Sequence, residues 1–491
     1  MAKTPGKLSE TQVAVLAKAT TTREAIQAAT RRGDSETALR GYQDLRRAGQ
    51  LSAEEWMRLG DLLDARGVLT EAVTAYKTAV SMNRALTEAR QKLAYGLVRM
   101  NRVQDALAEY AKGVQIDGTS ANLWTDYGVT LAAQQKEAAA GEAFNRALAI
   151  NPNLMLALVG RANVRAAQGR HDEAHPDFER AFKLQPDNPL PRFNYAGSCL
   201  RRGDWAEGFK HYEARWGVNN IVEPIHRIPG AWLGEGDIAG KSIWVEGEQG
   251  FGDMLMFCRF LPNLADLGAK VIVNVPRALQ DVIQSVDPRL EVLAMEDNRP
   301  VRADRYIPMA SLALAFKAMP DKMPMAPYLK PVDAPDRLVA PPRTERRRIG
   351  IVWSGGTPFG LSGVRAVPLQ DLLKAVSGAG EIIALQKEAT KAERALLAKH
   401  DVAFFGDDLK NFADTAALAV SCDLVVSCDT GVAHLVAGLG VPLWLLLPFF
   451  SGWWAASGDQ SPWYQEVRLW RQLTSEDWPG ILAKVKDALA A

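Results

Sequence analysis

The 491-residue chain has few cysteines and almost no charge imbalance. Its four cysteines, at 199, 258, 422 and 428, form no C-x-x-C pair and have no histidines at zinc spacing. We therefore expect reduced thiols in a cytoplasmic protein. Lys plus Arg total 58 and Asp plus Glu total 57, and this net charge of +1 disfavours a dedicated nucleic-acid binder. The start, MAKTPGKLSETQ, lacks the apolar core of a signal peptide.

Long apolar runs are also scarce, and one stretch, residues 432–450, has the length of a membrane helix. Gly438, Gly440, Pro442 and Pro448 interrupt it. These interruptions favour a short helix followed by a buried strand, LWLLL, and no transmembrane segment is expected. The apolar content of 47% is ordinary for a globular chain, and the length predicts two to four domains.

The first half of the chain is an internal repeat with a step of 34 residues. Small residues, large aromatics and further alanines recur together at this step. The early small position holds Gly60, Ala94, Gly128 and Ala162, the later one Ala72, Ala106, Ala140 and Ala174, and the aromatic one Tyr76, Tyr110, Phe144 and Phe178. Small residues let two antiparallel helices approach closely, and the aromatic fills the groove of the next repeat. The pattern resembles the tetratricopeptide repeat.

The repeat extends beyond its clearest copies in both directions. Ala38 and Tyr42 lie one period before Ala72 and Tyr76, and Trp205 to Trp216 resembles a last half-repeat. We therefore expect an all-α solenoid over residues 8–217. Such an array stacks into a superhelix with a concave face. That face favours a surface for a protein or peptide, and a scaffold or self-association module is the alternative.

From about residue 240 the pattern changes to short β-rich runs alternating with helix-length segments. The first block contains IWVEGE, VIVNV, LEVLAM and RYIPM, and the second RIGIVW, EIIALQ, VAFFG, DLVVS and PLWLLLP. Runs of this kind predict parallel sheets covered by helices on both faces. A proline-rich, charged linker separates the blocks. The sequence thus predicts two Rossmann-like lobes, 230–335 and 345–491, with ligands at the carboxyl ends of strands.

Three loops follow predicted strands and carry candidate chemistry. In EQGFGD at 248–253, the glycines permit a tight turn, and Asp253 stands where the next helix starts. Asp253 there is either a helix cap or a general base facing the cleft. In SCDTGVAH at 427–434, backbone N–H groups at the helix start attract a phosphate, whereas an ordinary helix cap with a core-facing His434 is the alternative.

The third loop, Trp353-Ser354-Gly355, follows RIGIVW and precedes Arg365, either a phosphate clamp or a solvated surface arginine. Gln386 and Lys387 end another strand at the edge where a ligand contact is expected.

Taken together, these loops resemble glycosyltransferases of the GT-B type, and most closely the heptosyltransferase-like family, here joined to tetratricopeptide repeats. The motifs that carry the resemblance are EQGFGD at 248–253, GIVWSG at 350–355, FADTAAL at 412–418, SCDTGVAHLVAGLGVPLWLLLP at 427–448 and SPWY at 461–464. The combination of repeats and lobes is similar to O-linked N-acetylglucosamine transferase and to bacterial flagellin glycosyltransferases, in which the repeats hold the protein acceptor.

The resemblance implies a fold and a set of site residues. The fold is a tetratricopeptide solenoid followed by a GT-B region of two lobes, the second of which binds a nucleotide sugar. The family's catalytic aspartate falls on Asp253. The predicted donor-binding set is Gly252, Trp353, Ser354, Gly355, Arg365, Gln386, Lys387, Asp429, Thr430, Gly431, Val432 and His434. The segment 356–364, GTPFGLSGV, departs from the family because it lacks the usual His, Asn or Asp.

The implied activity is transfer of a sugar from a nucleotide-activated donor to a Ser or Thr hydroxyl of a protein. Direct displacement would invert the anomeric centre. No D-x-D sequence occurs, so the enzyme is expected to be metal-independent and to need no cofactor besides its donor. The repeats are expected to bind the acceptor, with flagellin considered first, and no nucleic acid is expected. The alternatives are a lipopolysaccharide-type heptosyltransferase-like enzyme and a non-catalytic scaffold with a degenerate GT-B region.

Overall fold

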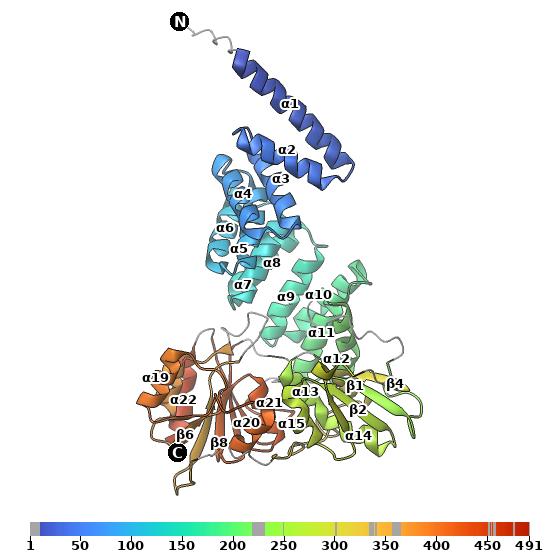
Figure 1. Ribbon diagram of the computed structural model, residues 1–491, viewed down its shortest axis with the longest axis vertical. Coiled ribbons are helices and arrows are strands. Elements are labelled where there is room, and N and C mark those ends of the chain that lie inside the picture. The colour runs from blue at the N-terminus through green and yellow to red at the C-terminus, as the bar shows by residue number, and fades with distance from the viewer. Residues whose placement is uncertain are drawn as a thin grey trace. The chain divides into compact units, whose positions relative to one another are not determined.

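The computed structural model describes residues 10–218, 231–248, 250–299, 302–332, 338, 341–355, 365–449, 452, 454, 458–474 and 477–490. The chain divides into two compact units, Met1–Val164 and Arg165–Ala491, called unit 1 and unit 2 below. Unit 1 consists of helices, and unit 2 contains helices followed by two parallel sheets (Figure 1). The predicted order, a repeat solenoid followed by an α/β region, is confirmed.

Unit 1 is built from helices that pack in consecutive pairs, α1 on α2, α3 on α4, α5 on α6 and α7 on α8 (Figure 1). A Ser52–Glu55 capping box starts α3, and Ser120 caps α7. The bounds are α1 (Glu10–Arg31), α2 (Ser35–Arg47), α3 (Ala53–Ala65), α4 (Leu69–Met82), α5 (Thr87–Arg99), α6 (Val103–Ile116), α7 (Ala121–Ala133), α8 (Glu137–Ile150) and α9 (Met155–Ala167), the last of which crosses into unit 2.

The repeat residues occupy the positions that their sizes predict. The four recurring aromatic side chains are at most 4% exposed, and the alanines of the small positions are fully buried. Phe144 shows why small residues are required, because a Cβ on Gly128 of its own repeat would lie 2.8 Å from its ring. A Cβ on Gly160 of the next repeat would lie 2.3 Å from the same ring. The aromatic therefore packs both within its repeat and against the next one.

Unit 2 begins with the last helices of the array, α10 (His171–Leu184), α11 (Pro189–Arg202) and α12 (Trp205–Tyr212), followed by the 3-10 turn η1 (Glu213–Gly217). Asn188 caps α11, and Gly203 ends it at φ 91°. Trp205 stacks on Trp463, with ring centroids 4.8 Å apart. One hydrophobic core runs from Ala196 through both sheets to Val485, so these helices belong to the same body as the sheets.

The first lobe contains a four-stranded parallel sheet in the order β3-β2-β1-β4. Its strands are β1 (Ser242–Glu246), β2 (Lys270–Val275), β3 (Glu291–Ala294) and β4 (Arg305–Pro308). The α-helices of this lobe are short: α13 (Phe251–Phe257), α14 (Leu261–Asp266), α15 (Gln280–Gln284) and α16 (Leu312–Ala315). The four predicted strands are all present, and the loop that follows β1 leads directly into α13.

The second lobe contains a six-stranded parallel sheet in the order β10-β9-β8-β5-β6-β7. Five of its strands match the predicted runs, and the edge strand β10 was not predicted. The strands are β5 (Arg348–Val352), β6 (Glu381–Ala384), β7 (Ala403–Phe404), β8 (Leu424–Cys428), β9 (Leu443–Leu447) and β10 (Val467–Arg471). The helices are α18 (Leu369–Val376), α19 (Lys391–Lys399), α20 (Phe412–Ala419), α21 (Gly431–Gly438) and α22 (Trp478–Ala490).

The long apolar stretch forms helix α21, a turn at Gly440 with φ 74°, and strand β9. This confirms the prediction of a short helix followed by a buried strand. Among the helices of the described residues, none has both the length and the apolar character needed to cross a bilayer. All four cysteines are free and buried.

The C-terminal helix α22 packs mainly on α18 and β10 of its own lobe. The resemblance to GT-B glycosyltransferases implies that this helix crosses back to the first lobe, whereas its main contacts lie within its own lobe. Other segments join the lobes instead. The N–H groups of Tyr328 and Leu329, near the end of the first lobe, donate to the carbonyl oxygen of Gly438 over 3.0 and 3.1 Å.

A buried arginine reinforces this junction. Arg259 is fully buried and lies in the 3-10 turn after α13. Its guanidinium donates to the carbonyl oxygen of Trp463 over 2.8 Å and to the hydroxyl of Tyr328 over 3.1 Å. The same group lies 4.7 Å from the ring centroid of Tyr464. The SPWY segment of the second lobe is thereby fixed to the first.

Candidate functional site

The loop after β1 places Asp253 in the first turn of α13. Gly250 is the N-cap residue, and its N–H donates to Oδ2 of Asp253 over 3.1 Å. Asp253 therefore caps its helix, as one of the two sequence interpretations requires. The residue as a whole is partly exposed, so capping does not remove it from solvent.

The surroundings of Asp253 raise its pKa to about 6. Burial is the main cause, and the negative charges of Asp429 and Glu248 add to it. The hydrogen bond from Gly250 and the positive charge of Arg365 act in the opposite direction. Since Asp429 and Arg365 belong to the second lobe, Asp253 lies within electrostatic range of both lobes.

The loop after β8 forms the start of α21. Thr430 is the N-cap residue, and its hydroxyl oxygen accepts the N–H of Ala433 over 3.4 Å. Asp429 is buried beside it and forms an ion pair with Arg365, with 3.8 Å between carboxylate and guanidinium. Burial raises the pKa of Asp429, and Arg365 and Arg471 oppose that rise. Gly431 and Val432 are partly exposed in the first turn.

The two helix starts lie against each other, because α13 packs on α21. A Cβ on Gly252 would lie 2.6 Å from Cδ2 of His434 and 3.6 Å from Cα of Gly431. Only glycine permits this approach. His434 itself is buried, with Nδ1 2.9 Å from the hydroxyl of Tyr464, and burial lowers its pKa to about 3. The imidazole is therefore neutral at physiological pH.

The loop after β5 joins the same region. A Cβ on Gly355 would lie 3.0 Å from Cγ2 of Thr430. The amide of Gln386 holds this loop, because its Oε1 accepts the N–H groups of Trp353 and Ser354 over 3.3 Å each. Its Nε2 donates to the hydroxyl of Ser354 over 3.2 Å. Gln386 therefore organises the loop, and the atypical segment 356–364 that follows lies outside the described residues.

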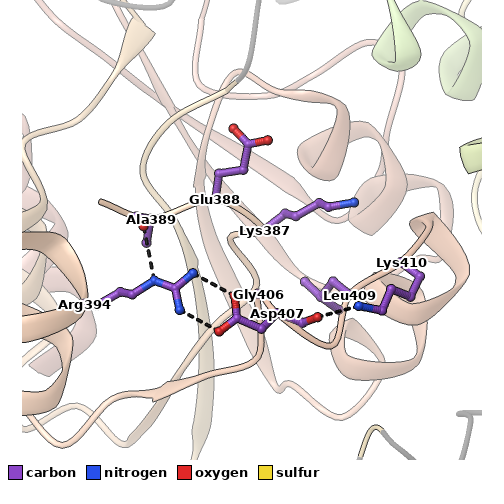
Figure 2. A pocket seen from close by; sticks show the side chains of 8 residues that line it. All are labelled: Lys387, Glu388, Ala389, Arg394, Gly406, Asp407, Leu409 and Lys410. Atoms are coloured by element: carbon purple, nitrogen blue, oxygen red, sulfur yellow. Dashed lines mark hydrogen bonds and ion pairs between the residues drawn. The ribbon is translucent and has the colours of Figure 1, made fainter. Parts of the chain in front are cut away.

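Lys387 lies apart from this meeting point, in a hollow at the carboxyl ends of β6 and β7. The hollow has a volume of about 390 Å³ and is shown in Figure 2. Arg394 forms a two-bond ion pair with Asp407 at 2.6 and 2.8 Å, and Lys410 donates to the carbonyl oxygen of Asp407. The residues that line the hollow are Lys387, Glu388, Ala389, Arg394, Gly406, Asp407, Leu409 and Lys410. The lining is polar and carries three cationic side chains.

Unit 1 has a separate hollow of about 650 Å³ on helices α3, α4, α5 and α7. Lys92 pairs with Asp61 at 3.0 Å, and the carboxylate of Asp126 accepts the side-chain amide of Gln91 at 2.6 Å. Burial raises the pKa of Asp126. Tyr95 is 54% exposed. The lining residues are Asp61, Asp64, Ala65, Tyr76, Glu88, Gln91, Lys92, Tyr95, Asn122 and Asp126, and we call this hollow the acidic groove.

Sequence reasoning missed several residues of these sites. Arg394, Asp407 and Lys410 follow predicted strands, and the strand-end rule would have found Asp407 from VAFFG. Arg471 ends β10, which was not predicted. Among the described residues, no group of three or more His, Cys, Asp or Glu is arranged to hold a metal ion.

The model of the tetratricopeptide repeat family matches residues 23–88, 92–154 and 159–215. The helices of this region are therefore tetratricopeptide repeats, and repeats of this family typically mediate contacts between proteins.

The chain is also similar to protein FlbA of Caulobacter vibrioides. The two are 25% identical over 437 residues, which cover 82% of this chain and 72% of FlbA. At this coverage the similarity cannot be confined to the repeats and extends into the α/β region.

Solved structures resemble only part of the chain. MamA is 19% identical, with a TM-score of 0.32 and coverage of 35% of this chain and 94% of MamA. A tetratricopeptide repeat protein from Parabacteroides merdae is 19% identical, with a TM-score of 0.36 and coverage of 40% and 77%. At these TM-scores the resemblances support no conclusion about function.

Proposed function

We propose that the protein is a glycosyltransferase that moves a sugar from a nucleotide-activated donor to a Ser or Thr hydroxyl of an acceptor protein. The observation that carries the proposal is the meeting of α13 and α21. Their starts bring Asp253 of the first lobe within range of Asp429 and Arg365 of the second. A carboxylate opposite a helix start and an arginine is an arrangement suited to displacement of an anionic leaving group.

Asp253 acts as the general base. With a pKa of about 6 it is mostly ionised at pH 7, yet more basic than an ordinary aspartate. Its carboxylate takes the proton of the acceptor hydroxyl while the oxygen attacks the anomeric carbon. The new C–O bond forms as the bond between sugar and phosphate breaks, and the nucleotide leaves with the electron pair. A single displacement of this kind inverts the anomeric centre.

The charge that develops on the leaving phosphate is stabilised from the second lobe. The first N–H groups of α21 point along the helix axis toward its start, where the helix dipole favours an anion. Thr430 uses its oxygen as a helix cap, and its O–H stays available as a donor. Arg365 pairs with Asp429 through one end of its guanidinium, and the side chain is 34% exposed, which leaves donors for phosphate oxygens.

The polar hollow of Figure 2 is the proposed site of the donor's nucleoside. It lies beside the strands that carry the 353–355 loop, and Gln386 and Lys387 are consecutive residues. Gln386 holds Trp353 and Ser354, while Lys387 lines the hollow. The end of β6 therefore contributes both to the 353–355 loop and to the hollow. In this proposal Gln386 acts on the donor through the loop that it holds.

The acceptor is proposed to bind the repeats. The acidic groove of unit 1 combines an exposed tyrosine, two side-chain amides and carboxylates, which suits an extended peptide segment with basic side chains. The array resembles that of flagellin glycosyltransferases, so flagellin is the acceptor to test first.

The proposal is tested by the Asp253→Asn variant. Transfer to the acceptor should fall by about 100-fold or more, because the amide cannot accept the proton, whereas donor affinity measured by calorimetry should change little. Glu55→Gln is the matched control, since Glu55 caps α3 in the same manner, with the Ser52 N–H 2.8 Å from Oε2. Persistent transfer by the Asp253 variant would refute its assignment as the base.

Intact-mass analysis of proteins from the same cell, incubated with the enzyme and a nucleotide sugar, tests the acceptor class. A mass increase of one sugar on a protein supports the proposal. Donor binding and donor consumption without a mass increase on any protein would favour the lipopolysaccharide-type enzyme. No binding of any nucleotide sugar would favour the non-catalytic scaffold.

A further inference from the structure

A buried arginine connects the end of the repeats with the loop that carries Asp253. Arg215 lies in η1, and its side chain is completely buried. Its guanidinium holds both carboxylate oxygens of Glu248, with Nε 2.9 Å from Oε2 and Nη2 2.7 Å from Oε1. Nη1 donates to Glu213 over 2.7 Å, and the group lies 4.7 Å from the ring centroid of Trp216.

Glu248 is in turn fixed to a second strand end of the first lobe. Its Oε1 also accepts the N–H of Ala310 over 3.0 Å, and Ala310 follows β4. The hydroxyl of Ser311 accepts from Nη2 of Arg215 over 2.7 Å. One guanidinium thus joins the last turn of the repeats to the carboxyl ends of β1 and β4.

Glu248 stands two residues before Gly250, whose N–H donates to the carboxylate of Asp253. We infer that Arg215 is a positioning residue that acts through Glu248 to hold the start of α13 and the carboxylate of Asp253 in the reactive arrangement. The kinetic part of this inference rests on the proposed function, and the structural part does not.

The geometry indicates more than a contribution to stability. A buried ion pair is often replaceable by apolar groups without loss of stability, so stability alone does not account for this pair. A two-bond contact between guanidinium and carboxylate fixes direction as well as distance, which a lysine cannot do. The pair lies beside the one loop in which the position of a carboxylate matters for the proposed reaction.

Charge gives the pair a second effect on Asp253. The charged groups that act on Asp253 are Glu248 of its own lobe, and Asp429 and Arg365 of the second lobe. The neighbouring His434 is neutral. Arg215 balances the negative charge of Glu248. Without Arg215, that charge acts on Asp253 uncompensated and further disfavours its ionised form.

The experiment compares Arg215→Met, Arg215→Lys and the double variant Arg215→Met with Glu248→Met. In Arg215→Met we expect kcat to fall about tenfold or more with donor affinity unchanged. The acidic limb of the pH–rate profile should move upward by about one pH unit. Hydrogen exchange in the peptide that covers 246–257 should become faster. Arg215→Lys should keep the pH limb and lose kcat, because it retains charge without the two-bond contact.

The double variant removes both charges, so its pH limb should return toward that of the wild type while kcat stays low. The control is Arg289→Met, in which an exposed arginine of the same lobe loses its pair with Asp287 at 2.6 Å. A lower melting temperature with unchanged kcat, pH limb and loop exchange in the Arg215 variants would overturn the inference. If Arg215→Met does not fold, the same measurements on Arg215→Lys and on the double variant test the positioning role.

The two proposals fail in different ways. Transfer that persists in Asp253→Asn, or is absent in the wild type, refutes the proposed function. The exchange rate of the 246–257 peptide still reports whether Arg215 holds the loop. Normal exchange in the variants together with transfer that depends on Asp253 would refute the positioning role alone.

Discussion

The proposed function gives Asp253 two tasks, helix cap and general base, that sequence reasoning treats as alternatives. One carboxylate oxygen caps α13 through Gly250, and the partly exposed group still faces charges of the other lobe. Capping orients the carboxylate, and burial makes it more basic. A helix cap and a general base are therefore compatible in one residue, since an aspartate has two oxygens.

The first prediction concerns the pH dependence of transfer. A general base works only when deprotonated, so kcat/KM should be constant above the pKa of Asp253 and fall tenfold per unit below it. The bend is expected near pH 6. Initial rates with donor and acceptor between pH 4.5 and 8 provide the measurement. A profile flat down to pH 4.5 would contradict the assignment.

The second prediction concerns Gly252. In Gly252→Ala the added methyl would lie 2.6 Å from His434, whose ring is fixed by Tyr464, so α13 and α21 must move apart. We expect transfer to fall by about 100-fold with a smaller effect on melting temperature, because small displacements at a reacting centre are costly. Gly141→Ala in α8 is the control, since its added methyl makes an ordinary 3.6 Å contact. Equal activity in both variants would contradict the close approach.

Among single residues, the sequence identified those whose candidate role can be recognised from adjacent residues in the chain. Asp253, Thr430 and Gly355 lie in glycine-containing loops that come after predicted strands. The structure brings these loops together where α13 meets α21. Arg215 and Arg259 were not predicted. Their partners lie 33 and 204 residues away in Glu248 and Trp463, and no local pattern marks a buried arginine as different from an exposed one.

Among the elements, the helices of the repeats were the most predictable. Each repeat has small and aromatic residues at the same positions, so helices recognised in one repeat predict the helices of the others. The structure adds that one aromatic ring contacts two repeats, as Phe144 does with Gly128 and Gly160. Stability should therefore depend on these rings more than on other large side chains of the same helices.

The third prediction tests this dependence. Phe144→Ala removes a ring that is 1% exposed and should lower the free energy of unfolding by about 3–5 kcal/mol. Ile150→Ala, at the end of the same helix, removes a side chain that is 42% exposed and should cost about 0.5 kcal/mol or less. Urea denaturation followed by circular dichroism compares the two. Similar losses would show that the aromatic does not join the repeats.

Edge elements were the least predictable. Strand β10, VRLWR, mixes apolar residues with two arginines and does not alternate strictly. It follows a segment rich in tryptophan, so neither a long apolar run nor a turn marks it. Arg471 at its end was missed for the same reason. The resemblance implied a different path for α22 from the one observed. The helix packs on α18, and only tertiary contacts determine that choice.

Across the whole molecule, the proposed tasks fall in different units. The acidic groove lies within unit 1, and the donor loops and the hollow of Figure 2 lie within unit 2. The change in period near residue 240 predicted this separation of helical and α/β parts. It did not predict that the last repeats share a core with the lobes, because that depends on contacts such as Trp205 with Trp463.

The fourth prediction follows from this separation. Asp126→Asn and Tyr95→Ala should each weaken acceptor binding by about tenfold, because they remove a carboxylate and an exposed ring from the acidic groove. Donor affinity should not change. Glu142→Gln, at a 61% exposed side chain of α8, is the control. Calorimetry on each variant measures both affinities. A parallel loss of acceptor affinity and donor affinity would contradict the assignment of the groove to the acceptor.

The burial of every native sulfhydryl has a practical consequence. A probe that reacts with accessible thiols should label the folded wild type slowly, so cysteines introduced at exposed sites such as Leu156 and Leu473 would carry nearly all of the label. One site lies in each unit. Spin labels at these two points would then report, with little background labelling, whether addition of an acceptor changes the distance between the two units.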